Sequence, residues 1–239
     1  MGLEPGTGAG PMRSARGPSS RTALRVAGAL LLLGGVTVLM GIVTAEALYP
    51  GTYTTGANEI SELGGRGGRD GFPSSAAIFT ASIVATGLLT LAAGILLGRA
   101  GAGALLGATV ALIGIGLVGV GLLPSGTGWP HLVSALGVFA AGGAAAIASA
   151  RVTEPPFRYI ALVMGLVSLG ILVGYAAVRG DAPLPGLGVG GLERWVAYPI
   201  LLWSVGFGGY LMGGGILRTG GGQAVVDEPG PSSPTGSDR

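Results

Sequence analysis

A small set of polar side chains in this sequence could bind a ligand or take part in catalysis, and they lie at the ends of long apolar segments. An ionisable group in such a place is costly unless it pairs with another group or faces a wet cavity. We therefore interpret these residues as a candidate polar site on one face of the protein: Glu46, Asn58, Ser61, Glu62, His131, Glu193, Arg194 and Tyr198.

Each of these residues also has a purely structural interpretation. Ser61 and Glu62 could act as nucleophile and base of a hydrolase, although Ser61 could equally cap a turn. His131 could donate a proton or contact a ligand, or it could simply hydrogen-bond a neighbouring loop. Glu193 and Arg194 could form a structural ion pair, or Arg194 could bind an anionic headgroup. These alternatives remain open from the sequence.

Several kinds of chemistry are excluded by the residues that are missing. The chain has no cysteine, one histidine and no lysine, so thiolate, multi-histidine and Schiff-base sites are ruled out. We expect no metal site, because the partners of the single histidine would all have to be carboxylates. We expect no cofactor, because the dinucleotide-like pattern Gly114–Gly119 lies inside an apolar segment rather than after a strand. We also expect no nucleic-acid partner, and interpret Arg66–Arg69 as a loop on the outer face.

The composition indicates an all-α integral membrane protein. Of the 239 residues, 49% are hydrophobic and 10% are charged, and the mean hydropathy is +0.68. About 20 apolar residues are needed for a helix to cross a bilayer. Six segments approach or exceed this length, at about 23–45, 75–97, 102–123, 131–150, 158–178 and 195–217. We predict a bundle of six transmembrane helices over 23–218, with disordered cytoplasmic tails at 1–22 and 219–239.

Arginine positions predict the orientation of this bundle. With six spans, nine of the thirteen arginines fall on the side of the two tails. The positive-inside rule then makes both termini cytoplasmic. The fourth span is short and rich in Gly and Ala, so we expect it to be the helix least exposed to lipid. One alternative is that the first span is a signal peptide cleaved after Ala45-Glu46-Ala47.

Short motifs between the spans resemble a known family. Tyr49-Pro50, Asn58–Gly64, Pro73 and Phe79 are followed by Pro124, His131, Gly191–Arg194, Tyr198-Pro199 and Trp203. Their order over residues 24–217 resembles the family called "domain of unknown function 998", whose first outer loop reads close to N-x-I-S-D-L-G. Here Glu62 stands at the acidic position. The stretch is also distantly similar to the Frag–DRAM–Sfk group, some members of which are linked to lipid handling. The resemblance implies a fold and topology but no activity.

The first outer loop, from Glu46 to Ser74, is long for a connection within a bundle. Ile60 and Leu63 would stay in water if it were loose, so we predict that Asn58–Gly64 folds back over the mouth of the bundle. There it should meet His131 and the Glu193-Arg194 pair, with Glu62 bound to Arg194.

These observations favour a non-enzymatic membrane module that binds lipid or a second membrane protein through its outer polar site. The alternatives are a carrier of a small or lipophilic solute and a membrane-embedded hydrolase, and whether the protein is an enzyme stays open. The abundance of Arg, Gly and Ala is typical of a GC-rich bacterium, which places the protein in the cytoplasmic membrane as a multi-pass protein. Convergence of the polar residues in one pocket would favour an enzyme. A cavity that reaches the middle of the membrane would favour a carrier.

Overall fold

The computed structural model describes residues 18–65, 73–177, 186–215 and 217, and these residues are helical apart from short connections. Six helices are long and apolar enough to cross a membrane. They are α1 (Pro18–Ala47), α2 (Pro73–Arg99), α3 (Ala104–Leu122), α4 (Trp129–Val152), α5 (Phe157–Ala177) and α6 (Gly188–Met212). Two short 3₁₀ helices, η1 (Ile60–Gly64) and η2 (Ser125–Thr127), lie in the loops. The described chain is therefore an all-helical, multi-pass membrane protein.

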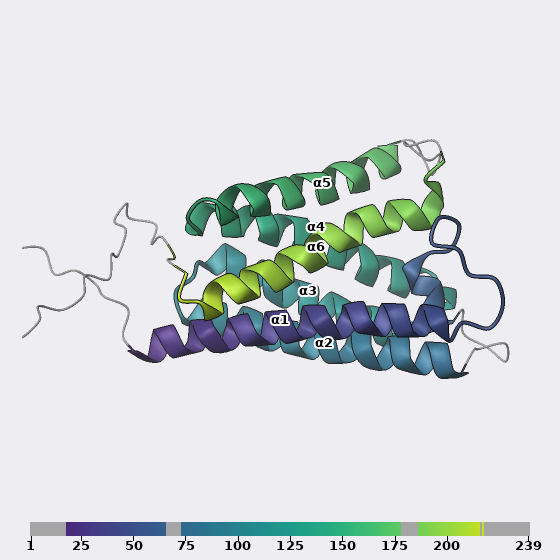
Figure 1. Ribbon diagram of the computed structural model, residues 1–239, viewed down its shortest axis with the longest axis horizontal. Helices are drawn as coiled ribbons and strands as arrows, with labels where there is room; N and C mark the ends of the chain where they lie inside the picture. The colour runs from purple at the N-terminus through teal and green to yellow at the C-terminus, as the bar shows by residue number, and fades with distance from the viewer. Residues whose placement is uncertain (1–17, 66–72, 178–185, 216, 218–239) are drawn as a thin grey trace, which may run out of the picture.

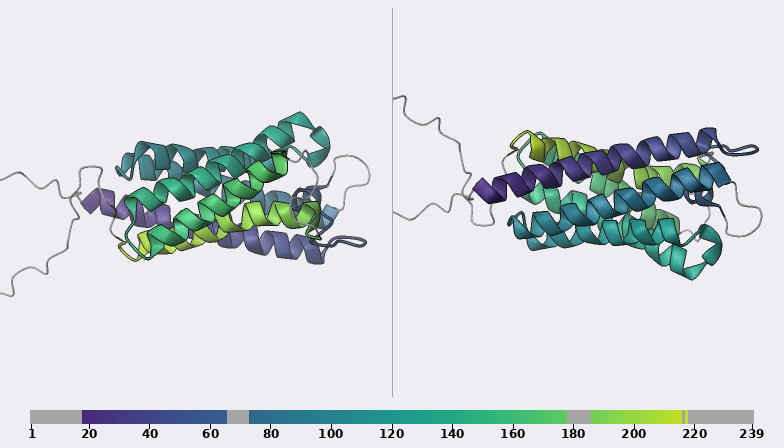
Figure 2. Two further views of the ribbon diagram at one scale, coloured as in Figure 1. Left: turned by 90° about the horizontal axis from the view of Figure 1, so that it is seen from above. Right: turned by 90° about the horizontal axis from the view of Figure 1, so that it is seen from below.

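Each helix packs against the next in chain order, and α6 returns to α1 (Figure 1). Five of the helices, α1, α2, α3, α4 and α6, form a closed ring. A further contact joins α4 to α6 and leaves α5 on the outside of these two helices. Figure 2 shows η1 and the start of α6 at one end of the elongated bundle, which we call the η1 end, and the start of α1 at the other.

Each predicted span overlaps one observed helix, and the sixth differs most in its bounds. That helix begins at Gly188 and ends at Met212, so Glu193 and Arg194 lie inside it rather than before it. The predicted N-terminal tail is wrong in its last residues, because α1 begins at Pro18. The rest of that tail and the stretch 219–239 lie outside the described residues.

The fourth span is among the most buried helices but is not set apart from the others. The most apolar window of α4 is 44% buried, the same share as in α1, α2 and α3, and no helix has a higher share. Its Gly/Ala-rich part from Ala141 to Ala150 is mostly buried, but Trp129 and Val133 near its start are exposed. The helix that differs is α5, with 17% buried, because it packs outside the ring.

Two clusters of buried side chains hold the bundle together. The larger cluster fills the half away from η1 and contains an aromatic stack in which Trp203 and Phe207 lie 5.5 Å apart between ring centroids. The smaller cluster fills the η1 end, and there Ile60 and Leu63 of η1 pack against residues of α1, α2 and α6. Ile60 is 6% exposed and Leu63 is 0% exposed, so η1 is part of the folded core. Burying two such side chains contributes about 3–5 kcal/mol, which offsets the cost of ordering the loop.

Candidate functional site

Arg194 forms a buried clamp that ties the first loop to α1 and α6. Its Nη2 donates to Glu46 Oε1 at 2.6 Å, which is also the salt bridge, and to the Tyr53 hydroxyl at 2.7 Å. Its Nη1 donates to the carbonyl oxygens of Thr55 and Asn58, each at 2.9 Å, and of Gly190 at 3.0 Å. The Arg194 guanidinium also lies 5.6 Å from the centroid of the Tyr53 ring. A planar fork with five donors suits this arrangement, which a lysine could not reproduce.

The predicted pair between Glu62 and Arg194 is wrong. Glu46, at the end of α1, is the carboxylate that binds Arg194, while Glu62 Oε2 accepts a hydrogen bond from Asn58 Nδ2 at 3.0 Å. The reason is geometric: α1 and α6 pack side by side, so the last turn of α1 reaches the first turns of α6. Glu62 instead stabilises the turn in which the Thr54 N–H donates to Asn58 Oδ1 at 2.9 Å.

The loop approaches the start of α6 so closely that only glycine fits there. The N–H groups of Gly190 and Gly191 donate to the Gly56 carbonyl at 2.9 and 3.3 Å. A Cβ atom on Gly190 would overlap the Asn58 carbonyl oxygen, and one on Gly188 would overlap that of Gly56. The free N–H groups at the start of a helix need such acceptors. The loop therefore caps α6, and α6 in turn orders the loop.

Tyr53 connects this clamp to η1, and it was absent from the sequence-based site. Its hydroxyl donates to the Glu59 carbonyl at 3.0 Å while it accepts from Arg194. Burial raises the pKa of Tyr53 to about 12, although the hydrogen bond from Arg194 acts in the opposite direction. The hydroxyl therefore stays protonated and keeps donating over the whole physiological range.

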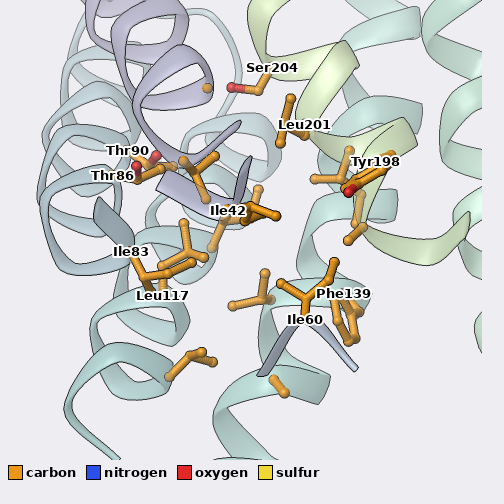
Figure 3. Close-up of a pocket in the computed structure, with 18 of the residues that line it drawn as sticks. Ile42, Ile60, Ile83, Thr86, Thr90, Leu117, Phe139, Tyr198, Leu201 and Ser204 are labelled. Atoms are coloured by element: carbon orange, nitrogen blue, oxygen red, sulfur yellow. The ribbon is translucent and has the colours of Figure 1, made fainter. Parts of the chain in front are cut away.

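A cavity lies inside the ring of helices. It has a volume of about 120 Å³ and extends from Ile60 and Ser61 at the η1 end to Leu31, Thr90 and Trp203 near the middle of the bundle. Figure 3 shows side chains from α1, α2, α3, α4, α6 and η1 around this common space, which we call the chamber. The lining is almost wholly apolar, and α5 contributes nothing to it. The chamber has room for on the order of ten water-sized spheres, which corresponds to roughly 300 Å³ of liquid.

Polar atoms gather where the chamber meets the η1 end. Glu193 Oε2 accepts a hydrogen bond from the Ile60 N–H, so this carboxylate pins the start of η1. His131 Nδ1 lies 2.7 Å from the Leu123 carbonyl oxygen. Because a carbonyl oxygen only accepts, Nδ1 carries a proton, and in the tautomer that carries no other proton Nε2 can accept a hydrogen bond.

Two polar atoms at this end of the chamber make no hydrogen bond within the protein. In the part of the chain that the structure describes, Arg194 Nε is the only side-chain nitrogen or oxygen that is buried and lacks a hydrogen bond. His131 Nε2 and Ser61 Oγ also lack one, so both atoms must keep accessible surface. Ser61, His131 and Glu193 all line the chamber. They can therefore offer hydrogen bonds to a bound molecule.

The same three residues also line a second cavity, which we call the groove. This groove, of about 510 Å³, lies at the η1 end between α4 on one side and α5 and α6 on the other. Ser61, His131, Ala135, Phe139 and Glu193 line both spaces, so the chamber and the groove meet there.

The structure thus divides the predicted site into three groups. Glu46 and Arg194 belong to the clamp, Asn58 and Glu62 hold the turn beside it, and Ser61, His131 and Glu193 border the chamber. Tyr198 lines the chamber and also a groove between α5 and α6. Sequence reasoning missed Tyr53 and the depth of the chamber. Tyr53 lies among small polar residues that carry no periodic signal, and an unfilled volume leaves no mark in a sequence.

A metal site and a serine-hydrolase contact are both missing from the described part of the chain. No group of three His, Asp or Glu side chains there could hold a metal ion. Ser61 and His131, both of which are described, make no hydrogen bond with each other, although a nucleophile and its base must lie within such reach.

Comparison with known proteins identifies the family but no characterised relative. A family model described as "Protein of unknown function (DUF998)" matches residues 13–210, which is most of the chain. No curated protein and no solved structure matches this sequence.

Proposed function

The chain belongs to the DUF998 family and has six helices that can cross a membrane, and we propose that it is a non-enzymatic module that binds one single-chain amphiphile inside its helix bundle. The observation that carries the proposal is the chamber, an apolar space in the ring of α1, α2, α3, α4 and α6. Ligand pockets are concave and mostly apolar, with a few convergent polar groups that fix orientation. The chamber has this form, with its polar groups at one end.

The depth and closure of the chamber fit an alkyl chain. Its far end is closed by Trp203, which is 1% exposed and donates from its ring nitrogen to Ser149 Oγ at 2.8 Å. Beyond Trp203 the stack continues to Phe207 and Phe157. A chain that enters from the η1 end would therefore stop near the middle of the bundle. With the arginine-based orientation, the polar head would lie at the outer leaflet of the cell membrane.

Trp203 provides a test of this proposal, because it lines the chamber. In the variant W129F/W195F it is the only tryptophan left, since the chain has three. The purified protein in nanodiscs is titrated with a twelve-carbon alcohol that carries bromine at the far end of its chain. Bromine quenches indole fluorescence at contact distance. The proposal predicts saturable quenching of Trp203 at a low mole fraction of the probe.

A matched pair of substitutions separates binding in the chamber from contact through lipid. Ala197 lines the chamber and Ala108 is exposed on α3, so A197F fills the space and A108F does not. A197F should abolish saturable quenching, and A108F should leave it unchanged. Quenching that rises linearly with probe in all variants would refute the proposal.

A carrier of lipophilic solutes is the second candidate function, favoured by the reach of the chamber to the middle of the bundle. A carrier would also need a path past the stack of Trp203 and Phe207. Movement of the same probe across proteoliposomes, faster than in protein-free vesicles and blocked by A197F, would support a carrier over a binding module.

A further inference from the structure

The charges around the groove suggest which kind of head group the amphiphile carries. The side chains that line the groove include two carboxylates, those of Glu59 and Glu193, together with His131. No arginine is among the described residues that line the groove or the chamber. Both spaces therefore present carboxyl groups and hydrogen-bond acceptors.

The nearest described arginine faces elsewhere. Arg194 follows Glu193 in α6, but its guanidinium is occupied by Glu46, Tyr53 and three carbonyl oxygens on the side of the first loop. Its fork is thus unavailable to a ligand in the chamber. An anionic head such as a phosphate would meet carboxyl groups with no arginine among the described lining residues to neutralise it, which is unfavourable in a desolvated site.

Open acceptor atoms point the same way. His131 Nε2 has no protein partner, and His131, at 9% exposed, is nine-tenths buried. His131 Nε2, Ser61 Oγ and the remaining lone pairs of the Glu193 carboxyl group can each accept a hydrogen bond. An ammonium group offers up to three donors and no acceptor. The donors of an ammonium group therefore match the acceptors at this end of the chamber.

We propose, on the basis of the proposed function, that the ligand is an amphiphile with a cationic amine head, which lies between Glu193, His131 and Ser61 while its chain fills the chamber. The groove between α4 and the pair α5 and α6 would be the side entrance, because it shares these three residues with the chamber. Exposed apolar side chains at its rim, among them Trp129 and Leu132, suit an approach through the lipid.

The test compares three probes with the same brominated twelve-carbon chain and different heads: a primary amine, an alcohol and a phosphate monoester. Each is titrated into the Trp203-only protein in zwitterionic nanodiscs, and affinities are corrected for partition into empty nanodiscs. The amine should bind at least about tenfold more tightly than the phosphate, with the alcohol between them.

Substitution of the carboxylate identifies its role. E193Q keeps an oxygen that can accept from the Ile60 N–H but removes the charge, so it should weaken the amine about tenfold and change the alcohol by less than about twofold. E154Q, in the loop at the opposite end of the bundle, is the control and should change neither. E59Q removes the second carboxylate of the groove and leaves the hydrogen bond between Glu193 and the Ile60 N–H in place. It should weaken binding of the amine about threefold.

The possible results separate the two proposals. Equal binding of all three probes, tighter binding of the phosphate, or an unchanged amine affinity in both E193Q and E59Q would overturn the head-group assignment and leave the chamber as a binding site. No saturable quenching by any probe would overturn the proposed function itself, and this inference with it.

Discussion

Removal of the Arg194 guanidinium should destabilise the protein more than any other single change at the η1 end. The substitution R194Q deletes the salt bridge to Glu46 at 2.6 Å and the hydrogen bonds to Tyr53, Thr55, Asn58 and Gly190. Truncation of one partner in a buried ion pair costs about 3–5 kcal/mol. The Glu46 side chain is 23% exposed, so water can partly replace its partner. We expect R194Q to lower the free energy of unfolding by about 2–4 kcal/mol.

A double-mutant cycle isolates the pair. E46Q leaves an amide oxygen that still accepts from Nη2, so it should cost about 1–2 kcal/mol. The double variant should cost less than the sum of the single variants by about 1–2 kcal/mol, because both remove the same interaction. Unfolding is followed by circular dichroism in mixed micelles as the denaturing detergent is increased. E154Q serves as the distant control and should be additive with R194Q.

The same cycle tests the correction to the sequence-based pairing. Glu62 binds Asn58 and makes no salt bridge with Arg194. E62Q combined with R194Q should therefore show a smaller coupling than E46Q combined with R194Q. Additivity of E46Q and R194Q within about 0.5 kcal/mol would refute the clamp as the structure describes it.

Three further predictions concern the loop, a tyrosine and the topology. G190A should lower the melting temperature in detergent, because its Cβ would overlap the Asn58 carbonyl oxygen. G209A in the same helix is the control and should have no such effect, because its Cβ would meet no atom within 4 Å. Equal effects of the two substitutions would contradict the close approach of the loop. Tyr53 has a pKa raised from 10.0 to about 12, so its contribution to stability is present below pH 10 and is lost as the pH rises towards 12. Tyrosinate absorbance of the wild type and Y53F should then coincide up to about pH 11 and diverge above it, and an early divergence would show that the hydroxyl is not buried. A reporter active only outside the cytoplasm should be active when fused near Arg69 and inactive near Arg99, and the reverse result would invert the predicted orientation.

The sequence was sufficient to predict the helices, because the length and hydropathy of each apolar segment determine whether it can span a bilayer. It was insufficient for the start of α6. Glu193 and Arg194 were assigned to a loop because charged residues are rare inside spans. In the structure Glu193 accepts a hydrogen bond from the Ile60 N–H, and Arg194 binds Glu46 and carbonyl oxygens of the first loop. Both residues can therefore lie inside the helix because neighbouring segments supply their partners.

The docking of the first loop could be predicted in part. Ile60 and Leu63 indicated that η1 would be buried, and both are. The partner of Arg194 could not be predicted, because the choice between Glu62 and Glu46 depends on the contact between α1 and α6, which the order of residues does not encode locally. The chamber left no trace either, since Ile42, Leu117 and Ile200 look like ordinary core residues in the sequence.

Photo-crosslinking tests the central claim most directly, because it reports where the chain of a bound amphiphile lies. The full protein in nanodiscs is irradiated with a twelve-carbon amine that carries a diazirine at the far end of its chain, and the modified residues are mapped by mass spectrometry. The account predicts labelling of chamber residues, above all Leu31, Thr90 and Trp203, and loss of this labelling in A197F. Labelling confined to outward-facing residues such as Met40, Leu112 and Val173, and unchanged in A197F, would contradict it.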